Sequence, residues 1–302
     1  MRIIILGAGG QIGKELVYSL GYAFPAAEII GTKRKLNPVF TRPEKPTAMN
    51  VRILQFDPFT HNWEKLGKVS VLINVIGIIQ ETPENSFGKI HAGLTKLILT
   101  NREKIGNPKV IQFSVLGAHA QSNSEFLRTK GQADAALLQQ DNTVVMRPSV
   151  VCTPNTVLVQ KLRMLQQLSK LLFYYLPFPA ELLNTKIQPV MIKDVMDLVQ
   201  TLCQTTDHPS LICLGGPEQI TLKQFLQMLP VKGLQILQLP QNRFSRILKI
   251  CTSIFPKLLN AEQIKLLQQD NTTDTQWCET LLKRPMTSTL PFWQKELQFY
   301  QS

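Results

Sequence analysis

The sequence predicts an α/β protein: a doubly wound parallel sheet with helices on both faces, followed by a smaller, mostly helical C-terminal lobe. Two observations carry this prediction. Over the first half of the 302-residue chain, short apolar runs alternate with helical patterns, which is typical of a parallel sheet covered by helices. The first run, Arg2–Leu6, ends directly in a cluster of glycines, so the chain opens on a strand, a tight turn and a helix.

Runs rich in Val, Ile and Leu predict six strands in the first half, and the run at 69–76 is apolar on both faces, as in a central strand. The predicted strands are Arg2–Leu6, Glu28–Gly31, Val51–Phe56, Val69–Ile76, Val110–Phe113 and Thr143–Met146, the last stopped by Arg147-Pro148. Helices are expected at 14–23, 87–102 and 126–139, and a proline-rich loop at 38–46.

The second half is less regular. Its expected elements are helices at 157–172, 193–203 and 221–228, a short strand at 187–192 and an apolar run at 211–214. We therefore predict a first domain at 1–150, completed by about 187–205, and a C-terminal substrate or partner lobe at 151–302.

Composition narrows the function classes. Hydrophobic residues make up 44% of the chain and charged residues 18%, which predicts a folded protein. Lys and Arg outnumber Asp and Glu by 33 to 21, giving a net charge of +12, which indicates an anionic partner: a phosphorylated cofactor, an anionic lipid or nucleic acid. No apolar run has the length of a membrane-spanning helix, and the apolar start is too short for a signal peptide. We expect a cytoplasmic protein.

The cysteines give no metal or disulfide pattern. They are five in number, widely spaced and without a CxxC pair: Cys152, Cys203, Cys213, Cys251 and Cys278. The interpretation is reduced, mostly buried thiols and no metal site.

Gly7, Gly10 and Gly13 have the spacing of a phosphate-binding turn between a strand and a helix. Without Cβ atoms the backbone turns tightly and a pyrophosphate can approach the helix N-terminus, where free amides favour negative charge. The residues expected to bind the dinucleotide here are Gly7, Gly9, Gly10, Gln11, Ile12 and Gly13, in an NAD(P)-binding Rossmann domain. The alternative is a glycine turn that only packs the strand against the helix.

The end of the second predicted strand distinguishes between cofactors. An acidic residue there would bind the ribose hydroxyls of NAD, but this chain has Lys33 and Arg34. Basic side chains suit a 2′-phosphate, so NADP(H) is favoured over NAD(H); the alternative is a solvated loop. Asp57, after the third predicted strand, is placed to accept from the adenine amino group, and is equally a common turn residue.

Several further segments resemble the short-chain dehydrogenase/reductases, in their extended and atypical branch (epimerase/dehydratase-like and NmrA-like). They are Asn74–Gly77, Arg147–Val151, Gln188–Val195 and Gly215–Thr221. Ile73–Ile78, Phe126–Lys130 and Gln188–Val195 resemble more closely the group that includes the NADPH-binding accessory subunit of respiratory complex I and its bacterial relatives. The resemblance spans roughly residues 1–225, and it implies that the cofactor site also includes Val75, Gly77, Ser114, Lys130 and Pro148.

The catalytic positions depart from this family's pattern. Active members use Tyr-x-x-x-Lys, whose tyrosine exchanges a proton with the substrate. Here Phe126 stands at the tyrosine position, while Lys130 is retained and can still hold the ribose. Ser114 ends the fifth predicted strand, but Val115 and Leu116 follow where the usual catalytic hydroxyl would fall. Losing a general acid typically removes a factor of about 10²–10⁴ in rate.

No other residue clearly replaces the tyrosine. None of the five tyrosines has a lysine four positions later. Water, Ser122 or Ser124 remain as substitutes that nothing in the sequence supports further. The histidines at 91, 119 and 208 are scattered, and such lone histidines are usually structural or exposed.

The second lobe is basic and apolar. Residues 155–193 hold five basic residues and one acid, and residues 231–260 hold no acid at all. At 243–257 the apolar side chains fall within about a third of a helical wheel, with basic residues opposite. This pattern fits a helix in a membrane interface and equally a surface helix packed on the lobe. Nucleic acid is not expected, because the basic residues lack interleaved aromatics.

The leading hypothesis is an NADP(H)-binding protein with little or no standard redox turnover that docks on a membrane or a membrane complex. The alternative is an active oxidoreductase or epimerase on a lipid-like, quinone or isoprenoid substrate. A third hypothesis is a transcriptional co-regulator that senses the dinucleotide ratio.

Overall fold

The computed structural model describes residues 1–35, 49–153, 157–228, 233–240, 243 and 261–298, which form two compact units. Unit 1 comprises Met1–Pro148, Ile192–Leu214 and Gln276–Pro285; unit 2 comprises Ser149–Met191, Gly215–Thr275 and Met286–Ser302. The predicted loop at 38–46 and, except for Arg243, the predicted amphipathic helix at 243–257 lie outside the described residues. No helix in the described ranges is long and apolar enough to cross a membrane.

Unit 1 is built on a seven-stranded parallel sheet, which confirms the predicted fold class. Its strands are β1 (Arg2–Leu6), β2 (Glu28–Lys33), β3 (Val51–Gln55), β4 (Val71–Asn74), β5 (Lys109–Phe113), β6 (Thr143–Pro148) and β11 (Leu211–Leu214). The order is β11-β6-β5-β4-β1-β2-β3, so the chain proceeds outward from β1 on one side and then returns to start again at β4. The sheet is therefore doubly wound, with its switch point between β1 and β4.

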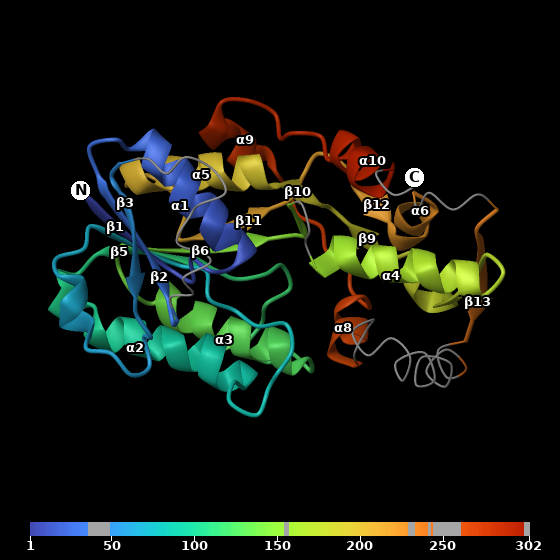
Figure 1. Ribbon diagram of the computed structural model, residues 1–302, viewed down its shortest axis with the longest axis horizontal. Coiled ribbons are helices and arrows are strands. Elements are labelled where there is room, and N and C mark those ends of the chain that lie inside the picture. The colour runs from blue at the N-terminus through green and yellow to red at the C-terminus, as the bar shows by residue number, and fades with distance from the viewer. Residues whose placement is uncertain (36–48, 154–156, 229–232, 241–242, 244–260, 299–302) are drawn as a thin grey trace. The chain divides into compact units, whose positions relative to one another are not determined.

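Helices cover both faces of this sheet (Figure 1). On one face lie α1 (Gln11–Ala23) and α5 (Ile192–Gln204); on the other lie α2 (Leu94–Asn101) and α3 (Glu125–Leu138). A further helix, α9 (Gln276–Leu282), packs against α5. Short 3-10 helices lie at Trp63–Leu66 and Glu103–Ile105. The central strands are buried on both faces, because their runs of Ile, Val and Leu pack against helices on each side.

Two sequence predictions in unit 1 need correction, and one unassigned run gains a role. β6 does not stop at Met146 but continues through Pro148, because Arg147 and Pro148 pair with β11. The run at 211–214, left unassigned by the sequence, is thus the seventh strand of the sheet. The predicted helix at 87–102 is a π-helical turn, η3 (Lys89–Gly93), followed by α2.

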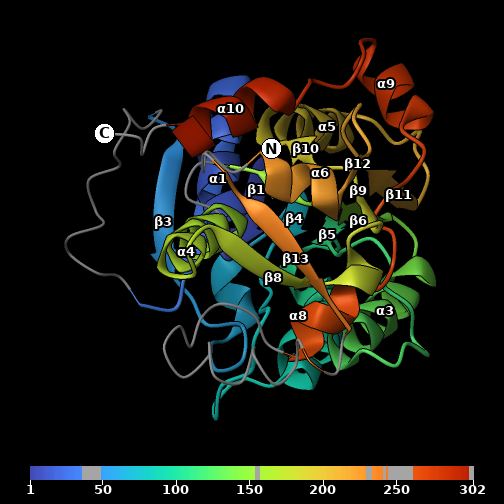
Figure 2. The ribbon, with the colours of Figure 1, turned by 90° about the vertical axis from the view of Figure 1, so that its right-hand side faces the viewer.

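Unit 2 combines helices with three short two-stranded pairs (Figure 2). Its helices are α4 (Val157–Leu171), the 3-10 turn η5 (Ala180–Leu182), α6 (Leu222–Gln227), α8 (Ala261–Leu266) and α10 (Leu290–Gln298). The pairs join β7 (Val151–Cys152) to β10 (Val190–Met191), β8 (Tyr175–Pro179) to β13 (Gln235–Leu239), and β9 (Lys186–Ile187) to β12 (Ile220–Thr221). The predicted strand at 187–192 is therefore split in two.

Candidate functional site

The glycine turn between β1 and α1 is packed so closely that side chains cannot be added at two of its positions. Gly7 has φ +94°, the left-handed region that favours glycine, and the Gly10 N–H donates to Gly7 O at 3.0 Å. A Cβ on Gly13 would lie 2.2 Å from Gly7 O, and one on Gly7 would lie 2.9 Å from Ile76 Cγ1. The turn thus holds helix, strand and the neighbouring loop in close contact.

The N-terminus of α1 has the features of an anion site. Gly10 caps the helix without a side-chain hydrogen bond, and the first turn carries no acid. A Cβ on Gly9 would meet only Lys33 Cγ, at 3.8 Å, so the Lys33 side chain passes beside this turn. Gln11 is exposed and Ile12 is half-buried. The backbone amides, the helix dipole and Lys33 together favour a negatively charged group here.

The loop after β4 borders the same turn at the switch point of the sheet. The Val75 N–H donates to Leu6 O at 3.1 Å, and the Ile76 N–H donates to Asn74 Oδ1 at 3.1 Å. Asn74 is itself buried and donates to Gln112 Oε1 at 2.8 Å. In doubly wound sheets, ligands bind in the crevice at this switch point. Val75 and Gly77, both predicted site residues, therefore lie on the loop adjoining the glycine turn.

Arg34 and Asp57, the predicted contacts of the 2′-phosphate and the adenine, make hydrogen bonds within their own surroundings. Arg34 is exposed, and its carbonyl oxygen accepts from Gln55 Nε2 at 3.1 Å. Asp57 holds a turn: its Oδ1 accepts from the Phe59 N–H at 3.0 Å, and its own N–H donates to His61 Nδ1 at 2.8 Å. The turn function that the sequence left open for Asp57 is thus present, and binding of adenine stays a prediction.

Lys130 extends from α3 to the ends of β4 and β5. Its Nζ donates to Phe113 O at 3.1 Å, and it would lie 3.3 Å from a Cβ on Gly77. Burial lowers the pKa of Lys130 to about 8, against the opposing attraction of Asp134. The ammonium group is therefore held beside the loop that carries Gly77, with its proton less tightly bound than in an exposed lysine.

Ser114 and Arg147 both bind one carboxylate, Asp134, which is fully buried on α3. Ser114 Oγ and Arg147 Nε each donate to Asp134 Oδ2 at 2.8 Å. In the described structure Asp134 Oδ1 has no hydrogen-bond partner, and burial raises the pKa of this carboxyl despite the two donors. The Ser114 hydroxyl proton is therefore engaged.

Pro148, another predicted site residue, lies at the end of β6, where its carbonyl accepts from the Leu116 N–H.

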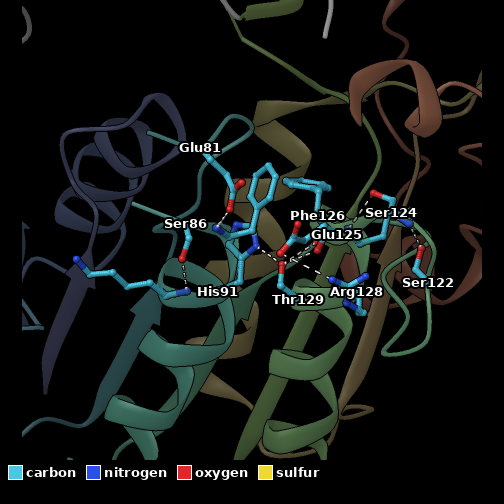
Figure 3. A network of polar contacts seen from close by, with 12 residues as sticks. Glu81, Ser86, His91, Ser122, Ser124, Glu125, Phe126, Arg128 and Thr129 are labelled. Atoms are coloured by element: carbon cyan, nitrogen blue, oxygen red, sulfur yellow. Dashed lines mark hydrogen bonds and ion pairs between the residues drawn. The ribbon is translucent and has the colours of Figure 1, made fainter. Parts of the chain in front are cut away.

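Phe126, at the position of the family's tyrosine, packs in an aromatic cluster at the start of α3 (Figure 3). Its ring meets Phe87 edge-on with centroids 5.6 Å apart and His91 edge-on at 5.5 Å. His91 Nδ1 lies 2.9 Å from Thr129 Oγ1, whose own proton is donated to Glu125 O at 2.9 Å. Nε2 faces the Ile78 N–H at 3.5 Å, which ties the cluster to the loop after β4.

Burial, reinforced by the charge of Lys130, lowers the pKa of His91 to about 3. The imidazole is therefore neutral at physiological pH and serves as a buried link between η3, α3 and the loop after β4.

The sequence did not single out Asp134, Arg147 as its partner, or the contact of His91 with Phe126. One local signal for Asp134 existed: it lies four residues after Lys130, on the same face of α3. Ser122 and Ser124 shape the start of α3 instead, with the Ser124 N–H donating to Ser122 Oγ and Ser124 Oγ accepting from the Leu127 N–H.

The described residues contain no cluster of His, Cys, Asp and Glu able to hold a metal ion. The four described cysteines are unbridged.

Comparison with solved structures defines the fold class. A nucleoside-diphosphate-sugar epimerase from Staphylococcus aureus matches over 97% of this chain and 100% of its own, with TM-score 0.70 and 14% identity. UDP-glucuronic acid 4-epimerase from Bacillus cereus, in complex with UDP-glucuronic acid and NAD, matches over 99% and 98%, with TM-score 0.69 and 15% identity. A tyrosine-to-phenylalanine mutant of that epimerase, in complex with a fluorinated UDP-sugar and NAD, matches with TM-score 0.68 over the same shares at 15% identity. The chain therefore has the overall fold of these sugar-nucleotide epimerases and of a solved dTDP-glucose 4,6-dehydratase, which is the fold that the motif resemblance implies.

Sequence comparison narrows the relationship. No protein-family model matches the chain. A curated relative from Arabidopsis thaliana, the mitochondrial NADH dehydrogenase [ubiquinone] 1 alpha subcomplex subunit 9, is 31% identical over 190 residues. The match covers 58% of this chain but only 44% of the relative, so the chain spans less than half the length of that protein.

Proposed function

We propose that this chain is an NADP(H)-binding protein of the short-chain dehydrogenase/reductase type with little or no standard redox turnover. The observation that carries the proposal is a contrast between two sites at the carboxyl ends of the central strands of the sheet. The glycine turn leaves no room for a Cβ at Gly7 or Gly13, as a pyrophosphate-binding turn would need, whereas Phe126, four residues before Lys130, buries its ring against His91.

Binding would rest on residues from three elements. The first turn of α1 would receive the pyrophosphate, Lys33 and Arg34 the 2′-phosphate, and Lys130 the ribose next to the nicotinamide. The fit is supported by the excluded Cβ positions at the turn and by the proximity of Lys33 to Gly9 and of Lys130 to Gly77. Nicotinamide, when bound, would supply hydride transfer, and these residues would hold and orient it.

Low turnover is proposed because the proton donors of the usual mechanism are absent or engaged. Phe126 has no acidic proton, and the Ser114 hydroxyl donates to Asp134. The Bacillus cereus epimerase in which one tyrosine is replaced by phenylalanine was solved in complex with NAD, which supports dinucleotide binding by this fold after loss of a tyrosine hydroxyl.

The protein is further proposed to dock on a membrane or a membrane complex. The Arabidopsis relative is named as a subunit of the mitochondrial NADH dehydrogenase, and the net charge of +12 suits an anionic surface.

A second candidate function is an active oxidoreductase or epimerase on a lipid-like, quinone or isoprenoid substrate. One observation favours it: the pKa of Lys130 is lowered to about 8, which is near the value suited to proton exchange at neutral pH. Lys130 would then supply the proton that Phe126 cannot.

The test is a fluorescence titration of cofactor-stripped protein with NADPH and NADH. We expect tight NADPH binding and weaker NADH binding. The double variant Lys33→Ala/Arg34→Ala should lose most of this preference, at least about tenfold. The matched control Lys96→Ala, which removes an exposed lysine on α2, should bind like the wild type. Failure of both nucleotides to bind would overturn the proposal, and equal affinities would overturn the NADP preference.

Oxidation of NADPH by wild-type protein with a quinone or lipid carbonyl at a rate typical of enzymes would favour the second candidate.

A further inference from the structure

One corner of unit 2 exposes five large apolar side chains. We call it the aromatic corner. It comprises the end of α4, the turn that follows, and the exposed face of the β8–β13 pair: Leu171, Phe173, Tyr174, Tyr175 and Leu237. Phe173 is 84% exposed and Leu171 62%. Figure 2 shows α4, β8 and β13 side by side in this part of unit 2.

The backbone of this corner is held in a conformation that aromatic residues disfavour. Phe173 has φ +53° and Tyr174 has φ +70°, both in the left-handed region where folding alone would favour glycine or asparagine. The turn is nevertheless ordered by hydrogen bonds, because the Tyr174 N–H donates to Ser169 O at 2.7 Å and Tyr174 O accepts from the Gln235 N–H at 2.9 Å. Two aromatic rings are thus exposed to solvent at backbone positions where glycine or asparagine would be more stable.

The β8–β13 pair extends the apolar surface. In this parallel pair Leu176 and Ile236 lie in register on the face that packs into the core of unit 2. Tyr175 and Leu237 lie on the opposite face, on adjacent strands, and both are about half exposed. The outer face of the pair is therefore continuous with the turn that carries Phe173.

The charge next to the corner is positive. Lys170 lies in the last turn of α4, and β8 and β13 contain no charged residue. Lys170 is exposed beside Leu171. Exposed aromatic and leucine side chains next to an exposed lysine match a bilayer surface, where apolar groups enter the headgroup boundary and basic groups pair with anionic lipids.

We infer that the aromatic corner is the surface by which this protein binds an anionic lipid bilayer, with Phe173 and Tyr174 entering the headgroup boundary and Lys170 pairing with lipid phosphate. The inference rests on the proposed docking function and names its surface. It differs from the earlier prediction for 243–257, because it uses residues of the α4–β8 turn.

The test is flotation of the NADPH-saturated full-length protein with phosphatidylcholine vesicles, with and without phosphatidylglycerol. Wild-type protein should bind the phosphatidylglycerol vesicles, and the double variant Phe173→Asn/Tyr174→Asn should bind at least about tenfold more weakly. Asparagine accepts positive φ, so the variant should unfold at the same temperature as the wild type or higher. The matched control Tyr22→Asn removes a tyrosine on α1 of unit 1 that is 53% exposed, and its vesicle binding should be unchanged.

Lys170→Gln should weaken binding a few-fold at low salt and have no effect at high salt, where surface charges are screened.

The outcomes distinguish the proposed surface, the aromatic corner, from membrane docking itself. Vesicle binding by the double variant that equals wild-type binding overturns the inference while membrane docking stands. Absence of wild-type binding to either vesicle overturns both the inference and lipid docking, and leaves nucleotide binding to its own titration. Analytical sedimentation tests a second copy of the chain as the occupant of the aromatic corner. If the wild type is a dimer, the double variant is a monomer and neither binds vesicles, the corner is a dimer interface and the inference is overturned.

Discussion

The glycine turn before α1 and the first turns of α3 both lie in unit 1, and they differ in what they retain from the pattern of active short-chain dehydrogenase/reductases. At the glycine turn, backbone packing leaves no room for a side chain on Gly7 or Gly13. At α3, Lys130 is retained, but Phe126 is apolar and Ser114 donates to Asp134. The comparison teaches that the features for holding a dinucleotide and those for exchanging a proton are separate parts of one fold.

The physical reason is that the two functions use different groups. Phosphate binding depends on backbone amides and a helix dipole, which many side chains around the turn support together. Proton transfer depends on one hydroxyl with the right pKa, so a single missing oxygen removes it. Substitutions at the turn and at α3 should therefore have separable effects.

The largest effect is expected from Gly13→Ala. Its new Cβ would lie 2.2 Å from Gly7 O and 2.9 Å from Ala8 Cα, and backbone atoms cannot give way locally. We expect a loss of at least about 3 kcal/mol in the free energy of unfolding, together with loss of NADPH binding. Gly88→Ala is the matched control, because a Cβ there meets nothing within 4 Å. Urea unfolding and NADPH titration measure both; a Gly13→Ala protein with wild-type values would show that this turn is not rigid.

Acid should destabilise the protein through His91. The pKa of His91 is about 3 in the folded state and about 6.5 when unfolded, so below pH 6.5 the unfolded chain binds a proton that the folded chain does not. The free energy of unfolding therefore falls as the pH falls through this range, by about 3 kcal/mol for this group at pH 4. In His91→Gln this loss should be absent, whereas His119→Gln, at an exposed position, should retain it. Unfolding curves at pH 7 and pH 4 give the comparison, and equal acid sensitivity of all three proteins would contradict the burial of a neutral His91.

A smaller effect is expected for Lys130→Met, which removes the ammonium beside Gly77. NADPH should bind about tenfold more weakly, as for one charge-assisted hydrogen bond. Because burial lowers the pKa of Lys130 to about 8, the wild-type affinity should also fall between pH 7 and pH 9, and the variant's should not. Titrations at both pH values test this, with Lys96→Met as the control. An affinity unchanged by Lys130→Met would remove this lysine from the cofactor site.

The smallest effect is expected for Phe126→Tyr. A restored hydroxyl would return a factor of about 10²–10⁴ only if the rest of the catalytic geometry were intact. Ser114 is engaged by Asp134 and the Phe126 ring packs on His91, so we expect NADPH oxidation with quinone or sugar-nucleotide acceptors to change by less than about tenfold. A hundredfold increase would mean that the hydroxyl alone was missing, and would favour the enzymatic candidate.

Much of the fold and the glycine turn of the candidate site could be predicted from the sequence. The central strands are apolar runs, and the turn at Gly7–Gly13 is defined by glycine spacing, both of which are local patterns. The bonds of Ser114 and Arg147 with Asp134 could not be predicted, since they depend on how α3 lies against β5 and β6. The contact of His91 with Phe126 likewise joins residues from η3 and α3.

Three features could be read from the sequence alone: the doubly wound sheet, the glycine turn and the absence of a tyrosine four residues before Lys130. Each follows from residue types in short stretches of the chain. Only the tertiary structure decided that β6 continues through Pro148, that Leu211–Leu214 completes the sheet, and that Phe173 and Tyr174 are exposed. Strand pairing and burial depend on partners many residues away, such as Gln235 for Tyr175. No local pattern contains that information, because a strand edge or an apolar face is defined by what packs against it.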